Sequence, residues 1–140
     1  TVDEDFRKGK RLPGEEDDPE NGIYVGMGIS CNVEGTGFGP FEGAVIRIES
    51  SGKVTLATGA APQGQGHETV LSQALADVLN ISPEDISVIT GDTRAIPYGY
   101  GAFASRLAVM ATNSVVIGGN ELRRKILTYA ADTWRLRRRI

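Results

Sequence analysis

A glycine-rich turn is the part of this sequence best suited to bind a ligand. It follows an apolar alternating segment, precedes a segment with helical periodicity, and consists of Gln63, Gly64, Gln65, Gly66 and His67. The start of a helix exposes unpaired backbone N–H groups and the positive end of the helix dipole, which together favour phosphate. Glycine lets the backbone approach an anion closely, and glutamine adds amide donors and acceptors. The turn therefore predicts a phosphate-binding helix start. A turn that only joins strand to helix remains open, because Gly-x-Gly is a weak motif.

A second glycine-rich stretch, residues 97–106, also precedes a helical pattern. It contains Gly101, Ser105 and Arg106, which offer a free backbone, a hydroxyl and a guanidinium within a few residues. Two helix starts in one small core could face a single extended, phosphate-bearing ligand. Arg106 could equally form a structural ion pair, so both roles are kept for it.

Histidine and cysteine are too few here to build a metal centre. His67 is the one histidine and Cys31 the one cysteine, whereas structural zinc and iron–sulfur sites use about four such ligands. We expect no metal ligand, and we expect Cys31 to be buried as a small apolar residue. Glu68 and Glu84 stand at helix starts, where a carboxylate suits the helix dipole. The sequence therefore identifies no catalytic residue.

The elements that position these residues follow from apolar periodicity. It predicts strands over residues 22–33, 42–49, 54–58 and 86–89, a helix over 67–80 and a long helix over 102–134. Ser82 before Pro83 predicts a single helical turn. Gly118 and Gly119 lie inside the long helix, where we expect a kink or a tight helix contact. Strands grouped before helices favour an α+β fold, a small sheet of about four strands packed against two main helices.

Composition divides the chain into three parts. Residues 1–21 are polar and acidic and predict a surface loop or disordered lead-in. Residues 22–134 form the ligand-binding segment, and residues 135–140 form a basic tail. A length of 140 residues fits one domain or one slice of a larger domain.

Net charge and hydropathy exclude some classes of partner. A formal charge of −3 gives no general attraction to nucleic acid. No apolar run reaches the roughly 20 residues that span a bilayer, so we expect no membrane span. A single cysteine fits a reducing compartment, and we predict a cytoplasmic protein.

Beyond single motifs, the order and gaps of several short segments resemble one known family. The segments are residues 63–69, Gln73, residues 85–86, residues 91–93, residues 97–101 and residues 105–106. They are similar to a consecutive stretch of the molybdenum-binding large subunit of xanthine dehydrogenase, aldehyde oxidase and aerobic carbon monoxide dehydrogenase. The similarity extends over residues 22–125 and is greatest to the bacterial carbon monoxide dehydrogenase-like branch.

This resemblance implies a part in binding molybdopterin with its molybdenum, usually as the cytosine dinucleotide in bacterial members. In the family, the regions that match this chain line the cofactor cleft. The implied cofactor-binding residues are Gln63, Gly64, Gln65, Gly66, His67, Gly101, Ser105 and Arg106. The family commonly has Thr, Gly and Ser where this chain has Ala102, Ala104 and Leu107, which implies fewer hydroxyl contacts in that loop.

The resemblance also implies a larger enzyme. The expected partners are the remainder of the large subunit and the iron–sulfur and flavin subunits or domains of the same oxidoreductase. The general-base glutamate of the family matches no residue here, so we predict that the isolated chain is inactive. Residues 22–33 and the long small-residue helix look shaped for burial by further protein, so we also predict that the isolated chain exposes apolar surface and self-associates. The rival hypotheses are a free-standing nucleotide- or anion-binding module and a non-catalytic interaction domain.

Overall fold

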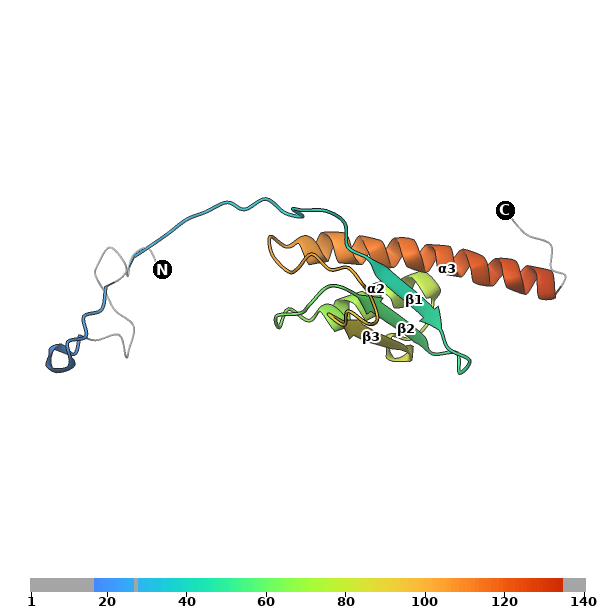
Figure 1. Cartoon of the computed structure of the whole chain (residues 1–140), viewed down its shortest axis with the longest axis horizontal. Coiled ribbons are helices and arrows are strands. Elements are labelled where there is room, and N and C mark those ends of the chain that lie inside the picture. The colour runs from blue at the N-terminus through green and yellow to red at the C-terminus, as the bar shows by residue number, and fades with distance from the viewer. Residues whose placement is uncertain (1–16, 27, 135–140) are drawn as a thin grey trace. The chain divides into compact units, whose positions relative to one another are not determined.

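The computed structural model describes residues 17–26 and 28–134. These residues fall into two compact units that divide between Val33 and Glu34. Because the units are not placed relative to one another (Figure 1), each is described by itself.

The unit that ends at Val33 contains one short 3-10 helix, η1, Pro19–Asn21. The Asp18 side chain caps this helix by accepting from the Asn21 amide, and an isolated bridge pairs Asp18 with Ile23. The predicted strand over residues 22–33 is wrong, since the described residues of this range form no strand. A strand needs a neighbour to pair its backbone, and here Val33 is fully exposed. Cys31 is exposed as well, not buried as expected.

Three strands form the sheet of the larger unit, in the order β1, β2, β3. Strand β1, Ala44–Ile48, pairs antiparallel with β2, Val54–Thr58, which confirms the predicted hairpin. Strand β2 also pairs with β3, Ile86–Thr90, in parallel. The sheet therefore has three strands where the sequence suggested about four, because the described part of residues 22–33 forms no strand.

The predicted helix after β2 is confirmed as α2, His67–Leu79, which carries the chain across to β3. Asn80 ends it in the left-handed conformation. The single turn predicted at Ser82 is the 3-10 helix η2, Pro83–Asp85, with the Ser82 hydroxyl as its N-cap. Two main helices and a small sheet make this an α+β fold, as predicted.

The long helix begins later than its periodicity suggested. A π-helical turn, η3, Leu107–Ala111, leads directly into α3, Thr112–Thr133. Residues 102–106 stay outside the helix because Ala104 and Ser105 have φ angles of 45° and 51°, which no right-handed helix accommodates.

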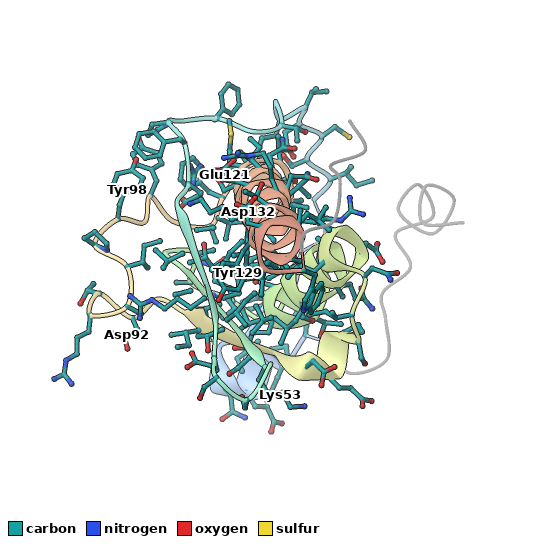
Figure 2. All side chains as sticks on the ribbon, turned by 90° about the vertical axis from the view of Figure 1, so that its right-hand side faces the viewer. Lys53, Asp92, Tyr98, Glu121, Tyr129 and Asp132 are labelled. Atoms are coloured by element: carbon teal, nitrogen blue, oxygen red, sulfur yellow. The ribbon has the colours of Figure 1, made fainter. Side chains whose placement is uncertain are left out.

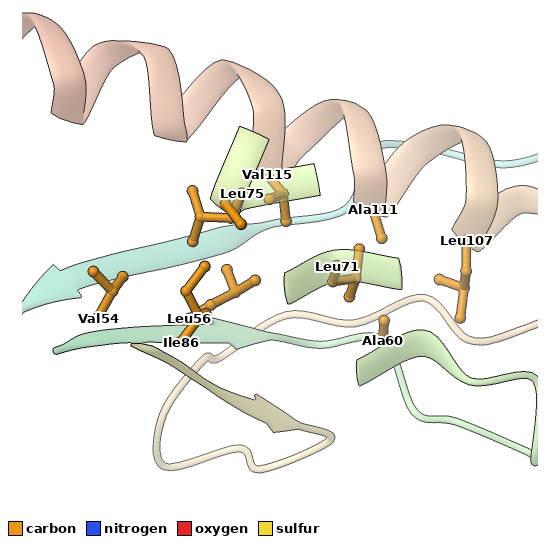
Figure 3. Packing of buried hydrophobic residues seen from close by; sticks show 10 residues of the cluster. Val54, Leu56, Ala60, Leu71, Leu75, Ile86, Leu107, Ala111 and Val115 are labelled. Atoms are coloured by element: carbon orange, nitrogen blue, oxygen red, sulfur yellow. The ribbon is translucent and has the colours of Figure 1, made fainter. Parts of the chain in front are cut away.

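The hydrophobic core lies between the sheet and the two helices (Figure 3). Leu56 of β2, Leu75 of α2 and Val115 of α3 are fully buried within it. Helix α3 runs unbroken through Gly118 and Gly119. A Cβ on Gly119 would lie 2.8 Å from Leu75 Cδ1. The tight helix contact, one of the two predicted outcomes, is therefore present at Gly119, whereas Gly118 faces Ile46 of β1.

None of the described helices combines the length and apolar composition needed to cross a membrane.

Candidate ligand-binding site

The two glycine-rich stretches meet at one cavity of about 310 Å³. The turn before α2 contributes Gln63, Gln65 and His67, and the connection before α3 contributes residues 102–108. These stretches are about 35 residues apart in the chain, and the sequence suggested that they face one ligand. The fold brings them to the same cavity because β2, which leads to the first stretch, pairs with β3, which leads to the second.

The turn of residues 63–67 holds its backbone open toward solvent. Gly64 and Gly66 have φ angles of 99° and 74°, a region that favours glycine, and a Cβ on either would meet nothing within 4 Å. Gly66 is the N-cap of α2, and no side chain caps the helix there. The amide of Gln63 donates to Gln65 Oε1 at 2.6 Å, and Gln65 Nε2 donates to Gln63 Oε1 at 3.2 Å. The two glutamines thus brace the turn while the first helical N–H groups remain uncapped.

His67 opens α2 and borders the cavity. Its side chain is partly buried, and its Nδ1 atom is buried with no hydrogen-bond partner among the described residues. Buried polar atoms of side chains are nearly always paired. A polar group of a ligand in the cavity would give this nitrogen the partner it lacks.

Residues 101–106 form an irregular loop, and residues 102–106 line the opposite wall of the cavity. Gly101, predicted as a site residue, instead borders a second pocket beside Tyr98 and Gly99. Gly101 has a φ of 111°, and Ala104 and Ser105 are two successive non-glycine residues in the left-handed region. Such residues cost roughly 1–3 kcal/mol each and persist where the surroundings enforce them. Ala104 is buried and its carbonyl accepts from the Gly37 amide at 3.0 Å, whereas Ser105 is exposed. The Ser105 hydroxyl therefore stands at the surface of the wall.

Arg106 is completely buried, and its guanidinium is committed to the protein. Nε donates to the Phe38 carbonyl at 2.8 Å, and Nη2 donates to the carbonyls of Pro40 at 2.7 Å and Phe41 at 3.5 Å. Nη1 donates to the Gly101 carbonyl at 2.9 Å and pairs with the Glu42 carboxylate. All five guanidinium N–H donors thus have acceptors.

The ion-pair role that the sequence left open for Arg106 is therefore the one its geometry shows. The rings of Tyr100 and Phe103 lie 4.9 and 5.5 Å from its Cζ atom and add cation–π contacts. Its side chain has no donor left for a ligand, and it contributes to the cavity as part of the wall.

Two further features of the site escaped sequence reasoning. Glu42, the buried partner of Arg106, looks like any acidic residue ahead of a strand. Gly59 and Gly99 pack backbone against backbone, and a Cβ on Gly59 would lie 1.9 Å from the Tyr98 carbonyl oxygen. Figure 2, which looks along α3, shows Tyr98 and Asp92 on the connection between β3 and α3, beside the sheet. This close contact fixes that connection against the end of β2.

Within the described residues, no group of three or more His, Cys, Asp or Glu side chains is placed to hold a metal ion. The arrangement of the site is instead one of backbone amides, neutral amide side chains, a hydroxyl and an imidazole around an open cavity. These groups suit a polar, anionic ligand better than they suit bond-breaking chemistry.

Comparisons with known proteins identify the family. The molybdopterin cofactor-binding domain family matches residues 4–139. The nicotine 6-hydroxylase large subunit of Paenarthrobacter nicotinovorans is 37% identical over 123 residues, which cover 79% of this chain and 15% of that protein. The carbon monoxide dehydrogenase large chain of Afipia carboxidovorans is 36% identical over 107 residues, covering 76% of this chain and 13% of that protein.

A solved structure agrees with these matches. The Cu,Mo-containing carbon monoxide dehydrogenase in its carbon monoxide-reduced state superposes with a TM-score of 0.66 and 34% identity, covering 69% of this chain and 12% of that chain. This chain belongs to the family of molybdenum-binding large subunits of xanthine dehydrogenase, aldehyde oxidase and carbon monoxide dehydrogenase, and it matches their molybdopterin cofactor-binding domain. The predicted resemblance is confirmed. The chain spans 12 to 16% of the length of the first curated relatives that it matches.

Proposed function

We propose that this chain holds molybdopterin as its cytosine dinucleotide, with the phosphate groups of the cofactor at the glycine-opened start of α2. The observation that carries the proposal is the shared cavity. The uncapped N-terminus of α2 and the strained loop before α3 form two walls of one space of about 310 Å³. A dinucleotide is long enough to contact both walls.

The chemistry of the walls fits such a ligand. Backbone N–H groups at the start of α2 and the positive end of its dipole favour a phosphate. Gln63 and Gln65 are exposed and offer neutral amide groups, while His67 Nδ1 lacks a partner. Among the described residues, no carboxylate lines this cavity to repel an anion.

Each residue then has a distinct task. Gly64 and Gly66 leave room for the phosphate, and the two glutamines hold the turn while their free amide atoms contact the ligand. Ser105 presents a hydroxyl on the opposite wall, and Arg106 supports the loop through its hydrogen bond to the Gly101 carbonyl. For Gly101, which lies just before that wall, the proposed task is to let the loop turn into it. When bound, the cofactor supplies the molybdenum centre at which the family hydroxylates an electron-poor carbon with oxygen from water.

Activity is proposed for the complete enzyme and not for this segment. The chain would work as one part of a molybdenum hydroxylase, completed by the remainder of the large subunit and by iron–sulfur and flavin subunits. A free-standing anion-binding module, the rival hypothesis, would bind the same phosphate chemistry without those partners.

The proposal is tested by Gly66→Val in the complete subunit. The branched side chain would occupy the space left for the phosphate and would oppose the positive φ of residue 66. Loss of one or two charge-assisted hydrogen bonds, at about 1.5–3 kcal/mol each, should weaken cofactor binding by roughly tenfold to ten-thousandfold. The measurement is pterin and molybdenum content per folded subunit, together with the melting temperature.

Gly52→Val is a matched control. Gly52 also has a positive φ, 87°, and also has open space around its Cβ position, but it lies in the turn between β1 and β2, away from the cavity. Both variants carry the same backbone strain. If folded Gly66→Val protein kept as much cofactor as Gly52→Val protein, the phosphate-binding role of the turn would be wrong.

A further inference from the structure

A buried carboxylate lies beneath the loop that lines the cavity. Glu42, two residues before β1, is 3% exposed. Its Oε1 atom accepts from the Tyr100 amide at 3.0 Å and from Arg106 Nη1. Carboxylates are rarely this buried unless they are paired, and breaking such a pair leaves an uncompensated charge. The position of Glu42 thus depends on the loop, and the loop depends on Glu42.

Together, Glu42 and Arg106 bind two segments that are far apart in the chain. Arg106 donates hydrogen bonds to the carbonyls of Phe38 and Pro40 in the segment before β1, and to the carbonyl of Gly101 in the cavity loop. Glu42 adds the Tyr100 amide at the beginning of the same loop. The loop is therefore fastened at Tyr100, at Gly101 and at Arg106, on both sides of its irregular part.

The irregular part is where this fastening matters. Ala104 and Ser105 lie between the fastened points, both in the left-handed region that residues with a side chain rarely adopt. This backbone forms a wall of the cavity. Without the hydrogen bonds at its two ends, such a segment would relax to more common backbone angles, and the wall would change shape.

Glu42 is itself anchored to α3. Its carbonyl accepts from the Ser114 hydroxyl at 2.5 Å, so the carboxylate extends from a fixed backbone. Its second oxygen, Oε2, is buried without a hydrogen-bond partner among the described residues. Among the described residues, both hydrogen bonds from the loop to the Glu42 carboxylate are therefore accepted by Oε1.

We propose that Glu42 is a positioning residue for the cofactor: by holding Arg106 and the Tyr100 amide, it keeps residues 102–106 in the conformation that forms the wall of the cofactor cavity. This inference rests on the proposed function. Glu42 acts through the loop and touches no ligand itself.

The test compares variants of the complete subunit in its assembled enzyme. Glu42→Gln keeps the size of the side chain but leaves Arg106 buried without its counter-charge. Val54→Ala is the control for stability alone, since Val54 is 3% exposed and Figure 3 places it at the opposite end of the core from Leu107, which borders the cavity. For each protein, the rate at which molybdopterin dissociates from folded subunit is measured beside the melting temperature.

We expect cofactor to leave the Glu42→Gln protein about tenfold faster or more than the Val54→Ala protein, when the two are compared at the same distance below their melting temperatures. A tenfold change corresponds to the loss of about one charge-assisted hydrogen bond between the protein and the ligand, which we expect when the wall is displaced. Equal dissociation rates would overturn the proposal, because a role in stability alone predicts them. If the Glu42→Gln protein fails to fold, Glu42→Asp takes its place, since it keeps the charge but shortens the side chain. Its rate of cofactor dissociation is then compared with that of Val54→Ala in the same way.

Gly66→Val in the same panel separates this inference from the proposed function. Loss of cofactor in Gly66→Val with retention in the Glu42 variants would remove only the positioning role. Retention in all of them would remove the phosphate-binding role of the turn as well. Loss in the Glu42 variants and in Gly66→Val, with retention in Val54→Ala, is the result expected.

Discussion

Arg106 illustrates at the residue scale how a side chain can belong to a binding site without contacting the ligand. An arginine beside a glycine-rich helix start invites the interpretation that it binds phosphate. Its five donors are instead used by four backbone carbonyls and one carboxylate. Because a planar guanidinium presents its donors in fixed directions, this arrangement suits arginine and not lysine.

Arg106→Lys should therefore destabilise the protein although it keeps the charge. Lysine has three donors for these five acceptors, so at least two charge-assisted hydrogen bonds are lost, for a cost of about 3–6 kcal/mol. Hydrogen exchange of the amides in β1 and the start of α3 would measure the loss locally. Arg124→Lys is the control: its pair with Glu121 is exposed on α3 and should contribute little. Equal protection in the two variants would contradict the role described for Arg106.

At the scale of elements, the packing of α3 against α2 and β1 decides which glycines can be replaced. Gly118 and Gly119 are neighbours in the same helix but face different surroundings. A Cβ on Gly118 would lie 3.1 Å from Ile46 Cδ1, the flexible end of a side chain on β1. A Cβ on Gly119 would meet Leu75 Cδ1 at 2.8 Å and Val78 Cγ1 at 3.0 Å, in the buried contact between the two helices.

We expect opposite effects from the two alanine substitutions. Both gain about 1 kcal/mol of helix propensity, but Gly119→Ala must also push α2 and α3 apart, an overpacking cost of about 1–3 kcal/mol. Gly118→Ala should leave the free energy of unfolding unchanged or slightly raised, and Gly119→Ala should lower it. Urea unfolding of both variants, followed by helical circular dichroism, would measure the difference. A Gly119→Ala protein as stable as Gly118→Ala would show that the helix contact is looser than described.

For the whole molecule, the chain carries apolar surface that its own fold does not cover. Large side chains along α3 and at its C-cap remain well exposed, among them Ile117 at 71%, Tyr129 at 75% and Trp134 at 70%. Phe38 and Phe41 add exposed aromatic rings beside the cavity loop. Surfaces of this kind mark contact with further protein. The first curated relatives are far longer than the matched region, which agrees with that interpretation.

The isolated chain should therefore self-associate. Light scattering should report species larger than a monomer at micromolar concentration, and an apolar dye should bind. Replacing Ile117, Leu127 and Tyr129 with Gln should reduce both effects while leaving helical circular dichroism intact, since these side chains are outside the core. A monomer that binds no dye before any substitution would contradict the expectation. Two further statements remain predictions: that the isolated chain lacks hydroxylase activity, and that the protein is cytoplasmic.

Most of the local structure could be predicted from the sequence. Apolar periodicity was enough for α2, for the β1–β2 hairpin and for β3, and Ser82 with Pro83 was enough for the short turn between them. These features depend on propensity, capping and burial of one face, which are written in neighbouring residues. The order and gaps of the segments likewise determined the family, which the comparisons confirmed. The basic tail of residues 135–140 and most of the acidic lead-in lie outside the described residues.

Features that depend on contacts between residues far apart in the chain became visible only in the tertiary structure. Residues 22–33 have the composition of a strand, but those of them that the structure describes form none, because no strand pairs with their backbone. Helical structure starts at Leu107, five residues later than the pattern suggests, because Ala104 and Ser105 have positive φ. The segment before β1 holds them there: the Gly37 amide donates to the Ala104 carbonyl, and Arg106 donates to the carbonyls of that segment. The burial of Arg106 and its pairing with Glu42, 64 residues away, could not be read from either neighbourhood. Contacts between residues this far apart in the chain depend on how the sheet and helices pack, and the periodicity of the sequence does not predict them.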